Sequence, residues 1–256
     1  MPTDLKIGII GGSGMEDPAF ISDYSSKAVS TPYGDSSSEL IMGNIADVPV
    51  AILSRHGPGH KINPTNVNYR ANVWSLKEEG CTNILAVTAC GSLRKRIEPG
   101  HFVFPDQFID RTTKRISTYF DGSDVQHVSM GEPFSAKLRK CLGQACADLK
   151  FAHHDSGTVV TIEGPRFSTK SESMLFRSWG CDVINMSTVP EICLARELKL
   201  EYQSIAMSTD YDCWHESEEE VTMEMIFAVM EKNVHNVKKL IEHVIPLIKR
   251  EYELGK

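Results

Sequence analysis

The sequence lacks the features that mark several classes of protein. No stretch approaches the roughly eighteen consecutive apolar residues of a membrane-spanning helix, and no tract rich in Pro, Gly or Ser divides the chain. Internal repeats are also missing. Of the 256 residues, 41% are apolar, which is enough to bury a sizeable core and excludes intrinsic disorder. We expect one domain that spans residues 1–256.

Cysteine is present, but without a metal-binding or disulfide pattern. The chain has no Cys-x-x-Cys pair, and its cysteines are odd in number and scattered. The seven are Cys81, Cys90, Cys141, Cys146, Cys181, Cys193 and Cys213. Residues 1–6 have neither the charged nor the long apolar region of a signal peptide. We therefore expect reduced thiols, mostly in the core, and a cytoplasmic protein.

A surplus of basic residues is missing too. There are 27 Lys and Arg residues against 34 Asp and Glu residues, a formal net charge of −7. This balance argues against nucleic acid or an anionic membrane surface as the main partner. A small anionic ligand is still compatible with it, because a local pocket can be basic in an acidic protein.

Strand-like and helix-like segments alternate along the chain. Short apolar runs bounded by Gly or polar residues predict strands at residues 5–10, 48–53, 84–87, 102–104, 159–162, 183–186 and 204–207. Apolar residues at helical spacing, with capping residues, predict helices at 68–79, 135–149, 169–179, 190–198 and from about 222. We expect Pro246 to kink or end the last helix. The pattern predicts an α/β fold with a mixed, mostly parallel sheet flanked by helices.

Polar residues follow the predicted strands at the points where ligands bind in open α/β sheets. They lie in the segments 12–14, 54–57, 88–92, 163–167, 186–188 and 208–212, and they include Ser13, Arg55, His56 and Thr88. Hydroxyl groups, an arginine, a histidine and backbone amides freed by glycine are the groups that hold a phosphate without a metal ion. The long irregular stretch 110–133 is of a length that is usually functional or interfacial.

Other phosphate and metal sites fit less well. The turn at residues 11–14 lacks the third glycine of a dinucleotide fingerprint, and Asp17-Pro18 interrupts the helix that should follow. Without a Gly-Lys-Ser/Thr sequence it is not a P-loop either. His56 and His60 have a helical metal-ligand spacing, but Gly57-Pro58-Gly59 between them rules out a helix. We therefore expect no metal site.

Asp210 and Asp212 allow three interpretations. Two carboxylates at this spacing can hold a divalent ion, can lie beside a heterocyclic leaving group, or can cap a turn. In an extended segment both point to one side, where repulsion and burial raise one pKa and produce a general acid. Phe167 is either a core residue or a surface on which a base or sugar stacks.

Eight segments together resemble a known family over nearly the whole chain. They include Ile-Gly-Ile-Ile-Gly-Gly-Ser-Gly and Arg-His-Gly, and they lie at residues 7–14, 55–57, 67–72, 88–93, 106–113, 161–167, 182–191 and 206–214. The sequence resembles the methylthioadenosine phosphorylase branch of the trimeric purine nucleoside phosphorylases. The resemblance implies a nucleoside phosphorylase-like fold and the attack of inorganic phosphate on the anomeric carbon of methylthioadenosine, which releases adenine and methylthioribose 1-phosphate.

The resemblance also implies a role for particular residues. It places phosphate against Ser13, Arg55, His56, Thr88, Ala89 and Ser187. It places the nucleoside near Phe167, Met186, Asp210, Asp212, His127, Met223 and Ile226, with His127 reaching a neighbouring subunit of a homotrimer. Catalysis is then assigned to Asp210, Ser187 and His56, with phosphate as co-substrate and without a metal or other cofactor.

Asp210 bears on the choice of base. A carboxyl group can hydrogen-bond N7 of adenine and accept from its exocyclic amine, whereas an asparagine suits a 6-oxopurine because its amide donates to the carbonyl oxygen. The carboxylate favours adenine. Phosphorylases of adenosine, methylthioinosine or 6-oxopurine nucleosides remain alternatives, as do an oxidoreductase and a non-catalytic protein that binds partners through its last helix.

Overall fold

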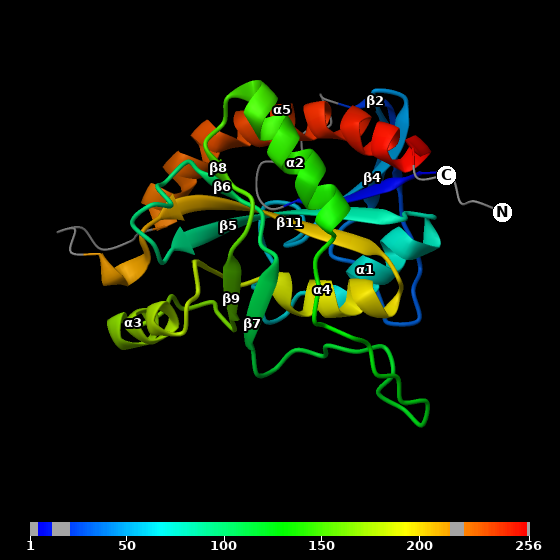
Figure 1. Ribbon diagram of the computed structural model, residues 1–256. Coiled ribbons are helices and arrows are strands. Elements are labelled where there is room, and N and C mark those ends of the chain that lie inside the picture. The colour runs from blue at the N-terminus through cyan, green and yellow to red at the C-terminus, as the bar shows by residue number, and fades with distance from the viewer. Residues whose placement is uncertain (1–4, 12–20, 216–222, 255–256) are drawn as a thin grey trace.

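The computed structural model describes residues 5–11, 21–215 and 223–254, without the side chains of 223–232 (Figure 1). Within this part of the chain lies one sheet. Its strands are β1 (Ile7–Gly11), β2 (Ser22–Lys27), β3 (Leu40–Ile45), β4 (Val48–Ser54), β5 (Asn83–Ser92), β6 (Phe102–Val103), β7 (Gln107–Arg111), β8 (His153–His154), β9 (Thr158–Ile162), β10 (Val183–Asn185) and β11 (Glu201–Asp210). All seven predicted strands are present, and β2, β3, β7 and β8 are additional.

The order of the strands confirms a mixed, mostly parallel sheet. The main path runs β2-β3-β4-β1-β5-β10-β9-β7, and β11 pairs with β5 and β6. The central pairs β1·β4, β1·β5 and β5·β11 are parallel. Antiparallel pairing occurs where β10 meets the last residues of β5 and at the β2-β3-β4 side. The central parallel strands therefore end at a common edge, where the polar segments predicted from the sequence meet.

Helices cover both faces of the sheet (Figure 1). They are α1 (Tyr69–Glu78), α2 (Ala136–Leu149), α3 (Lys170–Ser178), α4 (Thr188–Glu197) and α5 (Met223–Leu254). Because strand residues alternate between faces, Ile7 and Ile9 pack in the core layer with α2 and α5, whereas Ile10 packs in the layer with α1 and α4. A third, smaller cluster lies under α3.

The predicted helix boundaries hold for four of the five helices to within two residues. Asn68, Ser135 and Thr169 each cap a helix through a side-chain oxygen that accepts a backbone N–H. Pro246 does not end the last helix, because α5 continues through it to Leu254. Pro246 is exposed while its neighbour Ile245 is buried, so packing holds the helix and water can satisfy the carbonyl group that loses its bond.

Two further features limit where function can lie. None of the helices in the described part of the chain is long and apolar enough to cross a membrane. Residues 112–134 contain no helix or strand and form the excursion at the lower edge of Figure 1. The predicted irregular stretch begins two residues later than expected, since β7 extends to Arg111.

Candidate active site

Two buried hydroxyl groups meet, one within β5 and one just after the neighbouring strand β10. The Oγ1 atom of Thr88, in β5, lies 2.9 Å from the Oγ atom of Ser187, which follows β10. The Asn185 amide donates to Thr188 at 2.7 Å and to Thr88 at 3.4 Å, and it accepts from Thr161 at 2.9 Å. These bonds orient the cluster without a charged group, and they bring together two residues predicted to bind phosphate, Thr88 and Ser187.

Ser187 occupies the N-cap position of α4, but its hydroxyl does not cap that helix. An N-cap serine ordinarily accepts a bond from a backbone N–H of the first turn. Here the hydroxyl contacts Thr88 instead, and Ser187 is only 4% exposed. The arrangement can hold an anion with neutral donors.

The guanidinium group of Arg55, another residue predicted to bind phosphate, pairs with a buried carboxylate. Arg55 donates to Glu191 at 2.5 and 3.1 Å and to the Val87 carbonyl at 2.8 Å. The hydroxyl of Tyr202 donates to the same carboxylate at 2.9 Å. Burial alone acts to lower the pKa of Arg55, but Glu191 outweighs it and raises the pKa. Three N–H groups are therefore committed to the protein, and only the remaining ones can face a ligand.

His56 is held neutral. Its Nδ1 atom lies 2.8 Å from the carbonyl oxygen of Ile62, so Nδ1 carries the proton and Nε2 is an acceptor. Its ring stacks on that of His60 with centroids 4.2 Å apart. Burial and the charge of Arg55 lower the pKa of His56 to about 3. The side chain can then accept a hydrogen bond from a protonated phosphate oxygen, or take up a proton when a dianion arrives.

Asp210 ends β11 and is half-buried. Burial raises its pKa, although the Thr209 hydroxyl and the Asp212 amide each donate to the carboxylate at 2.7 Å and oppose the shift. Gly91 leaves room for this group, since a Cβ there would lie 3.1 Å from Asp210 Oδ1. A carboxyl group with a raised pKa can hold or deliver a proton.

We expected Asp210 and Asp212 to lie in one extended segment, but the strand ends at Asp210 and does not include Asp212. Asp212 begins a short 3-10 turn, has a φ of 48°, and accepts from the Ser168 hydroxyl at 2.8 and 2.9 Å. The two aspartates still lie close together, because both border Gly91. Phe167, next to Ser168, is 40% exposed, so it is not a core residue.

Met186 lies between the hydroxyl cluster and the segment after β9. A Cβ on Gly164, whose φ is 68°, would come within 2.5 Å of the Met186 sulfur atom, so glycine is required for this approach. The Met186 carbonyl accepts from Arg115 at 2.6 Å. Ala89 follows Thr88 in β5 and its carbonyl accepts from the Thr88 hydroxyl at 3.0 Å.

Four further predicted residues are His127, Ser13, Met223 and Ile226. His127 is exposed on the 112–134 excursion. Ser13 lies outside the described residues, and so do the side chains of Met223 and Ile226. Sequence reasoning missed Glu191, Ser168 and Arg115. The signal for Glu191 was an acidic residue inside the apolar stretch Val189 to Ala195, where only a paired carboxylate is stable.

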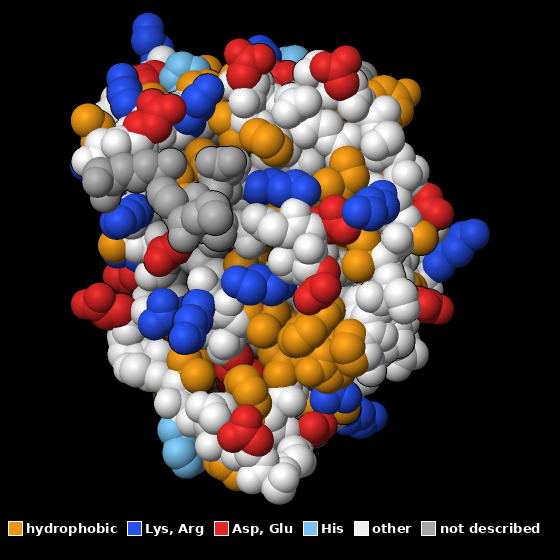
Figure 2. Space-filling view, turned by 90° about the vertical axis from the view of Figure 1, so that its right-hand side faces the viewer, with side chains coloured by type: hydrophobic (Ala, Val, Ile, Leu, Met, Phe, Trp, Pro, Cys, Tyr) orange, Lys and Arg blue, Asp and Glu red, His pale blue; other side chains and the backbone are white. Residues whose placement is uncertain are grey.

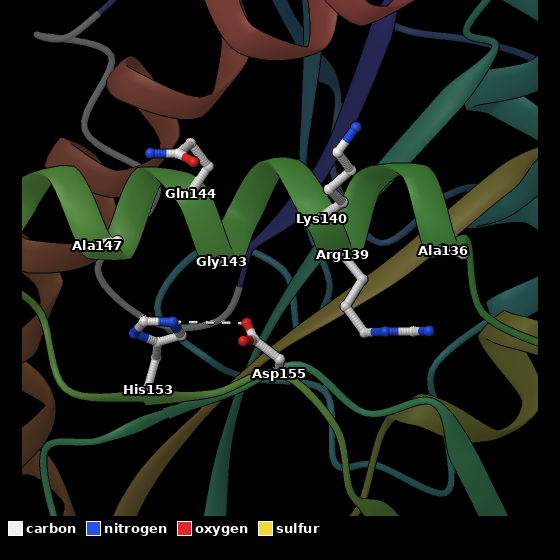
Figure 3. A pocket seen from close by; sticks show the side chains of 8 residues that line it. All are labelled: Ala136, Arg139, Lys140, Gly143, Gln144, Ala147, His153 and Asp155. Carbon is white, nitrogen blue, oxygen red and sulfur yellow. Dashed lines mark ion pairs between the residues drawn. The ribbon is translucent and has the colours of Figure 1, made fainter.

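A surface hollow beside α2 shares no residue with this cluster. Its volume is about 490 Å³. Figure 3 shows Lys140 and Gln144 above the ion pair of His153 with Asp155, whose atoms are 3.5 Å apart, and Arg139 extending from α2 down to the level of that pair. The described residues contain no group of three or more His, Cys, Asp or Glu side chains that could hold a metal ion. The strand-end cluster is therefore the candidate active site.

Comparison with known proteins identifies the family of this chain. The family model described as the phosphorylase superfamily matches residues 6–246. The chain belongs to the phosphorylase superfamily. S-methyl-5'-thioadenosine phosphorylases of Danio rerio and Aedes aegypti are each 52% identical to it over 95% of this chain and 89% of theirs.

Solved structures of phosphorylases share the fold. Methylthioadenosine phosphorylase from Schistosoma mansoni in complex with adenine has a TM-score of 0.91 and 41% identity, covering 96% of this chain and 92% of that one. A mutant adenosine/methylthioadenosine phosphorylase from the same organism, in complex with methylthioadenosine, has a TM-score of 0.90 and 42% identity with the same coverage. Within the superfamily, the chain belongs to the methylthioadenosine phosphorylases.

Proposed function

We propose that this phosphorylase cleaves 5'-methylthioadenosine with inorganic phosphate, giving adenine and 5-methylthioribose 1-phosphate. One observation carries the proposal. Thr88, which contacts Ser187, and Gly91, which borders Asp210, lie three residues apart on β5. At about 3.3 Å per residue, this separation is about 10 Å, enough for a ribose between a phosphate and a base. β5 thus positions both the phosphate-binding hydroxyl groups and the carboxyl group beside the base.

The residues at the phosphate end and at the base end of the site then have separate roles in the reaction. The glycosidic bond breaks toward an oxocarbenium ion, and the phosphate supplies the anion that stabilises it and attacks the anomeric carbon. Thr88 and Ser187 orient the phosphate, and the neutral His56 contributes an acceptor for a protonated phosphate oxygen. Asp210 protonates or hydrogen-bonds N7 of the departing adenine, and its burial suits it to hold that proton. No step requires a metal, so EDTA should leave the activity unchanged.

We also propose that the protein works as a homotrimer. His127 is exposed on the excursion formed by residues 112–134, a position from which it can reach another subunit. The face in Figure 2 shows basic and acidic side chains interspersed, with apolar side chains gathered in one area of its lower half. An apolar area of this kind supports association between subunits. Light scattering that shows a stable monomer would contradict this proposal.

Adenosine is a second candidate substrate. The Schistosoma mansoni relative is an adenosine/methylthioadenosine phosphorylase, and it shares 42% identity with this chain. The features at Asp210 select the base and not the 5' substituent, so they are compatible with both nucleosides.

The seven free cysteines, five of them buried, support a cytoplasmic location, which cell fractionation would test.

The decisive experiment follows adenine release from methylthioadenosine with and without phosphate, with adenosine and inosine in parallel reactions. Adenine release that requires phosphate supports the proposal. Inosine turnover without adenine release would overturn the role of Asp210, and no turnover of any of the three nucleosides would point to a binding protein.

A further inference from the structure

A buried arginine outside the proposed substrate contacts joins three segments of the active site. Arg115 lies at the start of the 112–134 excursion, and its side chain is only 1% exposed. Its guanidinium Nη1 atom donates to the carbonyl of Met186 at 2.6 Å and to that of Val189 at 2.7 Å. Its Nη2 atom donates to the Glu163 carbonyl at 2.6 Å. One planar group therefore fixes the backbone on both sides of Ser187 and Thr188, and links it to the end of β9.

The environment of Arg115 holds the guanidinium in one orientation. The Tyr69 hydroxyl accepts from Nη1 at 2.9 Å and in turn donates to the Pro64 carbonyl at 2.8 Å. The Glu163 carboxylate accepts from Nε at 3.3 Å. Backbone amides of Thr113 and Lys114 also donate to that carboxylate. Burial acts to raise the pKa of Glu163, but these bonds help to lower it to about 2. The carboxylate therefore stays charged beside Arg115.

The contact with Met186 acts directly on the phosphate end of the site. The Met186 carbonyl and the Ser187 N–H belong to one planar peptide unit, so a bond that fixes the carbonyl also fixes the direction of the N–H. Val189 has φ and ψ of −103° and 130°, which are not helical, so the first turn of α4 does not hold this backbone by itself. Arg115 supplies the constraint that the helix lacks.

We propose that Arg115 is a positioning residue, which aligns the 186–189 backbone so that Ser187 and Thr88 meet an inorganic phosphate. This inference rests on the proposed placement of phosphate at Ser187. Arg115 does not itself touch the phosphate in this arrangement. Because its guanidinium spans Glu163, Met186 and Val189, a single ammonium group cannot replace it.

The test compares Arg115→Ala and Arg115→Lys with a matched control, a residue of α4 that bonds the same excursion. Glu197, in α4, accepts from the Thr118 hydroxyl and the Tyr119 amide, each at 2.7 Å. Glu197→Gln loosens the excursion without touching the Met186 carbonyl. We expect Arg115→Ala to weaken phosphate binding and raise the KM for phosphate by about tenfold or more, because small misplacements at an active site are costly. Arg115→Lys should show a smaller rise, and Glu197→Gln a change below about threefold.

Two measurements keep the outcome clear. Phosphate binding is measured by calorimetry without nucleoside, so it does not depend on which nucleoside is turned over, and thermal unfolding reports folding. If Arg115→Ala does not fold, Arg115→Lys carries the test. Unchanged phosphate affinity in a folded Arg115 variant would overturn the inference, as would an equal loss in Glu197→Gln. Failure of the wild type to release adenine, with phosphate binding intact, would instead count against the proposed function alone.

Discussion

Asp210 is the residue whose chemistry distinguishes one purine from another. Its carboxyl group is half-buried and has a raised pKa because burial disfavours the charged form. We expect Asp210→Asn to reduce kcat/KM for methylthioadenosine by about 100-fold, because the amide cannot hold the proton for N7. Activity toward inosine should rise or hold, since the amide can donate to a 6-oxo group. Equal kcat/KM of the variant and wild type for methylthioadenosine would contradict this assignment.

His56 gives the protein a specific acid sensitivity. An unperturbed histidine titrates near 6.5, whereas burial and Arg55 hold the pKa of His56 in the folded state at about 3. Between these values the unfolded chain binds a proton that the folded chain does not, so stability falls as the pH is lowered from 6.5 toward 3.

The matched variant is His56→Asn, whose amide can still donate to the Ile62 carbonyl but does not titrate. We expect its free energy of unfolding, measured by urea denaturation without phosphate, to depend less on pH between 6.5 and 4 than that of the wild type. The same slope in both proteins would show that His56 does not titrate in this way.

At the scale of elements, the ion pair of Arg55 with Glu191 joins the end of β4 to the first turns of α4. Both side chains are almost fully buried, at 2% and 0% exposed. Removing one partner leaves an uncompensated charge, so we expect Glu191→Gln to lower the free energy of unfolding by about 3–5 kcal/mol.

The control is Glu172→Gln on α3. Glu172 pairs with exposed Arg166 and belongs to a capping box, in which glutamine can replace glutamate, so this substitution should lower the free energy of unfolding far less than Glu191→Gln. Urea unfolding of both variants tests the difference. Similar losses would mean that the buried pair is not what secures α4 to β4.

At the scale of the whole molecule, the proposed trimer predicts complementation between inactive subunits. If His127 of one subunit serves the site that contains Asp210 of another, mixed trimers of His127→Ala and Asp210→Asn contain some sites with both native residues. At methylthioadenosine concentrations below the KM of His127→Ala, co-expressed subunits should therefore exceed the summed activity of the separate variants. Activity equal to that sum would place His127 outside the site.

The sequence by itself determined the alternation of strands and helices, the caps of three helices and the segments that collect at the sheet edge, because hydrophobic periodicity and capping are local properties. It did not reveal β2, whose six residues are all exposed, or the persistence of α5 through Pro246. Those depend on pairing and packing with distant parts of the chain.

Tertiary structure alone decided which polar groups meet. Arg55 and Glu191 are 136 positions apart, and Thr88 and Ser187 are 99 apart, so no local pattern links them. The same holds for Arg115, whose partners lie 46 to 74 positions away. Residue types at strand ends indicated what the site could bind. The partners that orient each group were set by the fold, because burying a polar group is costly unless a partner from elsewhere in the chain bonds it.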